Sequence, residues 1–160
     1  MANNVLSTRP KLENVSNQPD SVKKVIRAKG ILWLATEAGH ALQGIASLAG
    51  RNFAVNPGAP WWAQVDKCDW PKGLETAIKP LWHEPYGDRQ NELVVIGHDM
   101  DEKAVRQELD ACLVTPEEFE AGIELWTSYE DPFKSDWDRE LGIALEEHDH
   151  SECGHDHGHA

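Results

Sequence analysis

Short apolar blocks separated by turn formers dominate the first half of the chain. A short helix is predicted at residues 20–30, where apolar positions share one face and a glycine closes the segment. The continuous apolar run at 31–35 (ILWLA) predicts a strand, and residues 42–48 and 53–55 predict two more around a glycine turn. Residues 61–65 are expected to extend this β-rich half.

The second half changes to helical spacing around one strand. Residues 71–82 place apolar side chains at i, i+4 and i+7, which predicts an amphipathic helix. The β-branched run 93–97 (LVVIG) predicts a buried central strand, and residues 99–113 predict a helix after it. A further helix is predicted to begin at a capping box formed by Thr115 and Glu118. Clustered strands followed by helices favour an α+β layered fold.

The two ends of the chain differ from its middle. Residues 1–19 are polar and interrupted by prolines, so we expect a flexible arm. One folded domain is expected over 20–137, and an acidic, histidine-rich tail over 138–160.

Charge excludes several classes of partner. The chain has 15 basic and 28 acidic residues and a formal net charge of −13, which opposes binding to nucleic acid or to an anionic membrane. It contains neither a long apolar run nor a signal-peptide pattern, so we expect a cytoplasmic protein. Its cysteines, Cys68, Cys112 and Cys153, are odd in number and far apart, as is typical of a reducing compartment; Cys112 is expected on a buried helix face.

Motifs for common catalytic chemistry are missing from the sequence. It contains no phosphate loop, G-x-G-x-x-G, G-x-S-x-G, H-E-x-x-H or C-x-x-C. We therefore expect that this chain binds no nucleotide and is not an enzyme.

The tail carries a dense set of metal donors. Histidines and one cysteine alternate with acidic residues and glycines: His148, His150, Cys153, His155, His157 and His159. Imidazole and thiolate suit zinc, copper, nickel or cobalt better than magnesium or calcium. The sequence therefore predicts a metal-binding tail; the alternatives are an acidic solubilising tail or a purification tag.

Several blocks in order resemble the C-terminal domain of CobW-type proteins, a GTPase metallochaperone family linked to zinc and cobalt trafficking. The blocks are VIRAKGILWLAT at 25–36, PWWA at 60–63, DWP at 69–71, GDRQNELVVIGHDMD at 87–101, LDACLVT at 109–115 and DPF at 131–133. The resemblance covers about residues 20–137 and implies an α+β domain with an antiparallel β-sheet backed by helices on one face. In the family the nucleotide site and a Cys-x-Cys-Cys metal site belong to an N-terminal domain, so no catalytic residue is carried over. A histidine-rich tail is common in the family.

These observations lead to a functional hypothesis with alternatives. The chain is expected to be a metal-binding accessory module, with zinc as the ion and cobalt or nickel as other occupants, that acts with a metal-requiring client protein or a separate CobW-type GTPase. Metal buffering, a protein-interaction scaffold or the remnant of a longer GTPase are alternatives. A metal-dependent hydrolase would require the isolated residues His40, His83 and His98 to converge.

Three further features have a structural and a functional interpretation. Trp33 is expected in the core. Of the pair Trp61-Trp62, one side chain is expected in the core and the other available to a partner, because successive strand residues face opposite ways. Charged residues before the strand at 93–97 are expected to form an ion-pair network, with contact to a partner as the alternative: Asp88, Arg89 and Glu92.

Overall fold

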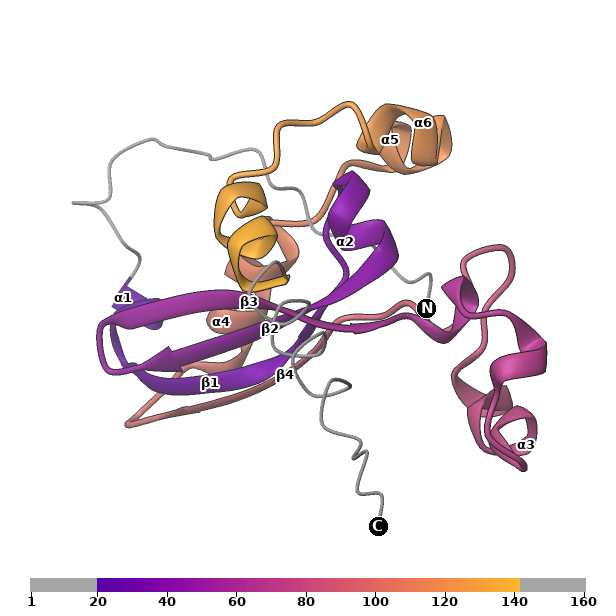
Figure 1. Ribbon diagram of the computed structural model, residues 1–160. Coiled ribbons are helices and arrows are strands. Elements are labelled where there is room, and N and C mark those ends of the chain that lie inside the picture. The colour runs from indigo at the N-terminus through magenta and orange to yellow at the C-terminus, as the bar shows by residue number, and fades with distance from the viewer. Residues whose placement is uncertain (1–19, 142–160) are drawn as a thin grey trace, which may run out of the picture.

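The computed structural model describes residues 20–141, which are built around a four-stranded antiparallel sheet (Figure 1). The strands are β1 (Val25–Leu32), β2 (Leu42–Ala49), β3 (Asn52–Pro60) and β4 (Glu92–Gly97), in the order β3-β2-β1-β4. Each strand pairs antiparallel with its neighbours. The predicted α+β fold with an antiparallel sheet is confirmed.

The other elements are short helices: α1 (Asp20–Lys23), α2 (Glu37–Ala41), α3 (Leu74–Ile78), α4 (Glu102–Asp110), α5 (Pro116–Ala121), α6 (Ile123–Trp126), the 3-10 turns Trp62–Gln64, Lys67–Asp69 and Lys79–Leu81, and a helical segment at 134–141. In Figure 1, α4 and the segment 134–141 lie on the same side of the sheet, as the resemblance implied. No helix within residues 20–141 is long and apolar enough to cross a membrane.

The inner face of the sheet carries one hydrophobic core. Leu32, Ala46 and Val55 lie on adjacent strands and are nearly inaccessible. Trp137, on the segment 134–141, closes this core with 1 % of its surface exposed, and its indole Nε1–H donates to the Val55 carbonyl over 2.9 Å. The segment 134–141 is thereby fixed to the sheet.

A second core of aromatic rings lies at one end of the sheet. Trp33 is fully buried, as predicted, and its ring centroid lies 5.1 Å from Tyr86 and 5.7 Å from Trp126. Phe119 packs on Trp126 at 5.4 Å. This cluster joins the chain before α2 to α5 and α6.

The first predicted helix and strand are wrong in their boundaries. The helix ends at Lys23, and the predicted helical stretch up to Gly30 belongs to β1. Gly30 does not end a helix; it permits close strand pairing, because a Cβ there would collide with the backbone of Glu92. The run 31–35 leaves the sheet after Leu32, so Trp33 and its neighbours form core outside the strands.

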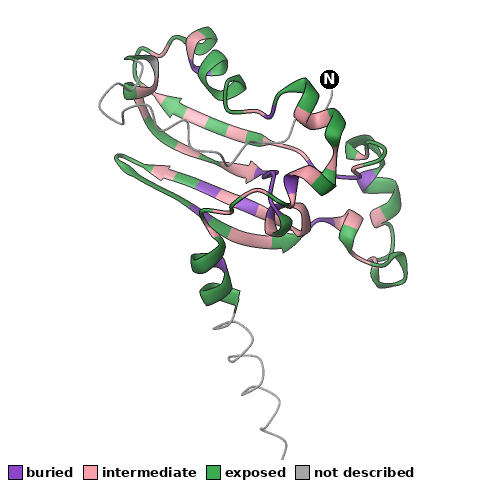
Figure 2. Ribbon diagram, turned by 90° about the horizontal axis from the view of Figure 1, so that it is seen from above, coloured by how far each residue is buried: buried purple, intermediate pink, exposed green. Residues whose placement is uncertain are grey.

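The predicted central strand 93–97 is instead an edge strand. Within residues 20–141, β4 pairs only with β1, and its residues alternate between exposed and half-buried, as Figure 2 shows. Val94 and Ile96 are 60 % and 54 % exposed. The central positions belong to β1 and β2, which pair on both sides, so the unbroken apolar run of β4 does not indicate a buried strand here.

Two further predicted elements differ from the structure. The helix predicted at 71–82 begins only at Leu74, after Gly73 at φ 90°, and becomes a 3-10 turn at Lys79, next to Pro80, which has no N–H to donate. Residues 61–65 form a 3-10 turn and not a strand.

Helix α4 also stops short of its prediction. It begins at the N-cap Asp101 and ends at Asp110, so Cys112 lies beyond it and is exposed, with its Sγ 3.4 Å from the Glu108 carbonyl. The predicted burial of Cys112 is therefore wrong. The capping box is confirmed: the Thr115 hydroxyl accepts from the Glu118 N–H, and the Glu118 carboxylate accepts from the Thr115 N–H.

Candidate functional site

The excursion between β3 and β4, residues 61–91, is anchored by a buried carboxylate. Asp88 is 6 % exposed and accepts the backbone N–H of Trp62 at 3.0 Å and that of Ala63 at 2.9 Å, one on each oxygen. These two donors lie at the start of a 3-10 turn, where backbone N–H groups have no partner within the turn. Asp88 therefore fixes the first turn of the excursion against its last residues.

Arg89 extends this anchor to α2. It is 3 % exposed, and its guanidinium donates to the carbonyls of His40 at 2.9 Å and Tyr86 at 2.7 Å. Burial lowers the pKa of Arg89, and the charge of Asp88 opposes that change. Asp88 and Arg89 thus act on backbone groups, whereas Glu92, the third residue of the predicted network, is exposed on β4.

His40 is the most perturbed histidine of the described chain. Its Nδ1 atom is buried and has no hydrogen-bond partner among residues 20–141. Burial, and then the nearby charge of Arg89, lower its pKa from 6.5 to about 4. His40 is therefore neutral at pH 7, and its site disfavours the imidazolium.

This perturbation predicts a pH-dependent stability. Between pH 6.5 and 4 the unfolded state protonates His40 while the folded state does not, so stability falls as the pH falls through this window. We expect a loss of about 1–2 kcal/mol from this group, since partial solvent access reduces the effect. Urea unfolding of H40Q from pH 7 to 4 should show a flatter dependence of stability on pH than wild type. Parallel curves for H40Q and wild type would contradict this assignment.

Three half-buried tryptophans form a row on the excursion. The ring of Trp70 lies 6.3 Å from Trp62 and 5.7 Å from Trp82, both in edge-to-face geometry. Trp61 is 1 % exposed and donates its indole N–H to Gly39, so the prediction that one of the pair is in the core is confirmed. The availability of Trp62 to a partner stays a prediction.

One cluster of possible metal ligands lies within the described residues. Asp66, Cys68 and Asp69 offer ligand atoms that all lie within 4.8 Å of one another, and all three residues are exposed. Sequence reasoning singled out Cys68 alone; the spacing D-x-C-D was the available signal. Exposed acidic groups commonly approach each other without an ion, so the proximity of these three residues alone does not indicate a metal site.

The histidines of the hydrolase hypothesis do not belong to that cluster. His40, His83 and His98 are absent from every group of three candidate ligands found in residues 20–141. His98 instead pairs with its neighbour Asp99 at 2.9 Å on the surface. The predicted tail ligands lie outside the described residues: His148, His150, Cys153, His155, His157 and His159.

Comparison with known proteins gives the family. The family described as "Cobalamin synthesis protein cobW C-terminal domain" matches residues 5–113, about two thirds of the chain. No solved structure matches. The domain boundaries predicted at 19/20 and 137/138 stay predictions.

Two of the matching relatives have zinc in their names. The chain is 34 % identical over 129 residues to a zinc-regulated GTPase metalloprotein activator of Dictyostelium discoideum, covering 79 % of this chain and 27 % of the relative. It is 30 % identical over 118 residues to a zinc chaperone of Mycobacterium tuberculosis, covering 71 % of this chain and 28 % of the relative. The chain thus spans little more than a quarter of the length of these relatives. On this match, and on an antiparallel sheet with helices on one face, the chain belongs to the cobW C-terminal domain family.

Proposed function

We propose that this chain is a metal-binding accessory module with zinc as its ion, held by the donors of residues 148–159. The observation that carries the proposal is the density of imidazole, thiolate and carboxylate groups in that stretch. Such donors bind zinc well, and cobalt and nickel are accepted by similar ligands. The names of the two relatives support zinc over the other ions.

The folded part has a separate role in this proposal. It recognises a metal-requiring client protein or a separate CobW-type GTPase, while the tail carries the ion. Nucleotide chemistry lies outside these 160 residues, whose sequence contains no phosphate loop. Alternating histidines with glycines between them offer overlapping sites from which an ion is readily released.

A buffering or scaffold role is the second candidate. The row Trp62, Trp70 and Trp82 favours the scaffold role, because aromatic side chains are enriched at protein interfaces. Metal transfer and metal buffering differ in the rate at which a client protein acquires zinc. A transfer protein loaded with zinc accelerates metallation of an apo client beyond the rate of zinc release, whereas a buffer does not.

Zinc affinity of the full chain tests the location of the site. In a competition titration against a chromophoric chelator at pH 7, we expect the variant H148Q/H150Q/C153S/H155Q/H157Q/H159Q to lose tight binding. Wild-type affinity should also fall as the pH drops below about 6.5, because protonated imidazole does not bind metal.

A matched control uses the cluster on the excursion. The variant D66N/C68S/D69N removes a thiol and two carboxylates from exposed positions and should keep wild-type zinc affinity. If this control loses binding while the tail variant keeps it, the ion sits on the excursion and the proposal is wrong. If neither wild type nor variants bind zinc, the chain is better described as an interaction domain.

A further inference from the structure

The outer face of the sheet, opposite Trp137, carries an uncovered basic and apolar surface. The β1–β4 register places Arg27 beside Ile96 and Lys29 beside Val94, and all four side chains are exposed. Antiparallel sheets usually present polar residues on the solvent face, so two exposed β-branched side chains are a departure. We call Arg27, Lys29, Val94 and Ile96, together with Arg51 of the adjoining β2–β3 turn, the outer sheet patch.

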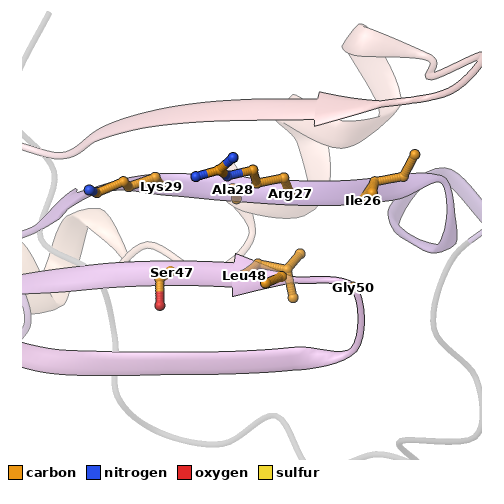
Figure 3. A pocket seen from close by; sticks show the side chains of 8 residues that line it. Ile26, Arg27, Ala28, Lys29, Ser47, Leu48 and Gly50 are labelled. Atoms are coloured by element: carbon orange, nitrogen blue, oxygen red, sulfur yellow. The ribbon is translucent and has the colours of Figure 1, made fainter.

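The patch extends to the end of the sheet at which the β2–β3 turn lies. Arg27 pairs with Ala49, and the next N–H, that of Gly50, donates to the Ile26 carbonyl at 2.9 Å, which brings Arg51 to the same end of the sheet. A shallow depression of about 400 Å³ runs along β1 and β2 here. Figure 3 shows Arg27 and Lys29 following one another along β1, with Ser47 on the neighbouring strand.

The basic groups of the patch are unneutralised. Within residues 20–141, neither Arg27, Lys29 nor Arg51 takes part in a salt bridge or a side-chain hydrogen bond. Four basic residues elsewhere do, with carboxylates three or four residues away: Lys23, Arg106, Lys134 and Arg139. Lys72, Lys79 and Lys103 do not, but the register does not place them beside one another on a strand face. Three unpaired positive charges on a chain of net charge −13 form a local site for acidic groups.

The chain itself supplies a segment with matching chemistry. Residues 142–160 begin with apolar side chains at Ile143 and Leu145 and continue with acidic residues: Glu146, Glu147, Asp149, Glu152 and Asp156. The described chain ends at Leu141, in the segment that Trp137 attaches to edge strand β3. A stretch of this length extends over up to roughly 60 Å, whereas four strands span only about 15–20 Å.

Tethering favours this occupant over a free acidic partner. A segment joined by a short flexible linker reaches an effective concentration in the millimolar range. Individual exposed ion pairs contribute little, about 0.2–1 kcal/mol each, and half-occupancy at a millimolar concentration requires about 4 kcal/mol. Apolar contact of Ile143 and Leu145 with Val94 and Ile96 therefore has to contribute as well, and a dilute acidic partner would need a still larger free energy of binding. The weakness of the individual ion pairs keeps the contact reversible and sensitive to salt.

We propose that the acidic segment 142–160 docks on the outer sheet patch and that metal binding releases it. The second clause rests on the proposed function, because the donors of residues 148–159 alternate with the carboxylates that would dock. A bound divalent cation neutralises part of the negative charge and engages side chains needed for docking. By linkage, docking weakens metal affinity to the same degree as metal weakens docking.

Docking is tested without metal, on the full chain. In ¹⁵N-resolved NMR spectra of the metal-free protein, the variant E146Q/E147Q/D149N/E152Q/D156N should shift amide signals of β1 and β4 around Arg27, Lys29, Val94 and Ile96. Salt at 0.5 M should produce the same shifts in wild type. Shifts confined to other parts of the domain, or none at all, would overturn docking.

The reciprocal test changes the patch. R27Q/K29Q/R51Q should alter the signals of residues 146–156, while K72Q/K79Q/K103Q, with the same change in charge at exposed positions elsewhere, should leave them unchanged. Equal effects of the two variants would show a nonspecific charge effect and overturn the site. Shifts that grow with protein concentration would identify a second copy as the occupant and overturn the intramolecular contact.

Adding zinc chloride tests the coupling. Zinc should move the β1 and β4 signals of wild type in the direction seen for the neutralised segment, and R27Q/K29Q/R51Q should bind zinc more tightly by roughly threefold to tenfold. If zinc binds without moving these signals, metal binding does not release the segment, and only the docking part of the proposal stands. If zinc does not bind, the proposed function fails while the metal-free experiments still decide docking.

Discussion

Replacing Trp137 with alanine is expected to lower the free energy of unfolding by about 3–5 kcal/mol, the range for large aromatic residues truncated in a core. The side chain is 1 % exposed and packs against Leu32, Leu34, Ala46 and Val55. Its loss leaves a cavity on the inner face of the sheet and removes the donor to the Val55 carbonyl. Urea unfolding of the full chain followed by circular dichroism measures the change.

Two variants separate packing from other effects of losing a tryptophan. W137F keeps an aromatic ring but not the N–H, so we expect an intermediate loss of about 1–2 kcal/mol. W82A removes a half-buried tryptophan whose N–H donates to nearby Glu84, and should destabilise less than W137A. If W137A unfolds at the wild-type urea concentration, the segment 134–141 does not contribute to the core.

Elements determined by neighbouring residues were predictable from sequence. The β2–β3 hairpin follows from apolar residues on both sides of the turn formers Gly50 and Asn52, and Gly50 adopts φ 61° in the turn. The capping box at Thr115 and Glu118 also depends only on residues three apart. Both were correct because the turn of the hairpin and the cap of the helix each depend on residues a few positions apart.

Elements determined by distant partners were not predictable. The stretch 25–30 has apolar spacing compatible with a helix, and only pairing with β2 and β4 makes it a central strand. The stretch 93–97 has the composition of a buried strand, but no second neighbour exists for β4 in the described sheet. The composition of a strand shows how hydrophobic it is, whereas its burial depends on whether it lies at the centre or at the edge of the sheet.

The same distinction applies to the candidate sites. The donors of residues 148–159 are adjacent in sequence, so composition alone predicts a metal site there. The outer sheet patch was missed because it depends on the register that places Arg27 and Lys29 beside Ile96 and Val94. No local pattern connects residues almost seventy positions apart.

Replacing Asp88 with alanine is expected to lower the free energy of unfolding by about 3–5 kcal/mol, since removal of one partner leaves buried polar groups uncompensated. The backbone N–H groups of Trp62 and Ala63 lose their acceptor, and the buried guanidinium of Arg89 loses a neighbouring negative charge. Because these contacts fix the excursion, its aromatic row should become disordered before the sheet unfolds. Near-ultraviolet circular dichroism reports ring packing, and far-ultraviolet circular dichroism reports the strands.

The conservative variant D88N decides whether the acceptor or the charge matters more. Asparagine retains one acceptor oxygen of the two that bind Trp62 and Ala63, so hydrogen bonding alone predicts roughly half the loss seen for D88A. If the charge beside Arg89 dominates, D88N is as damaging as D88A. The excursion and the tail are separate in the proposed function, so both variants should retain wild-type zinc affinity at temperatures where they remain folded. A loss of zinc binding in D88N would place metal ligands within the folded domain and would contradict the assignment of the ion to residues 148–159.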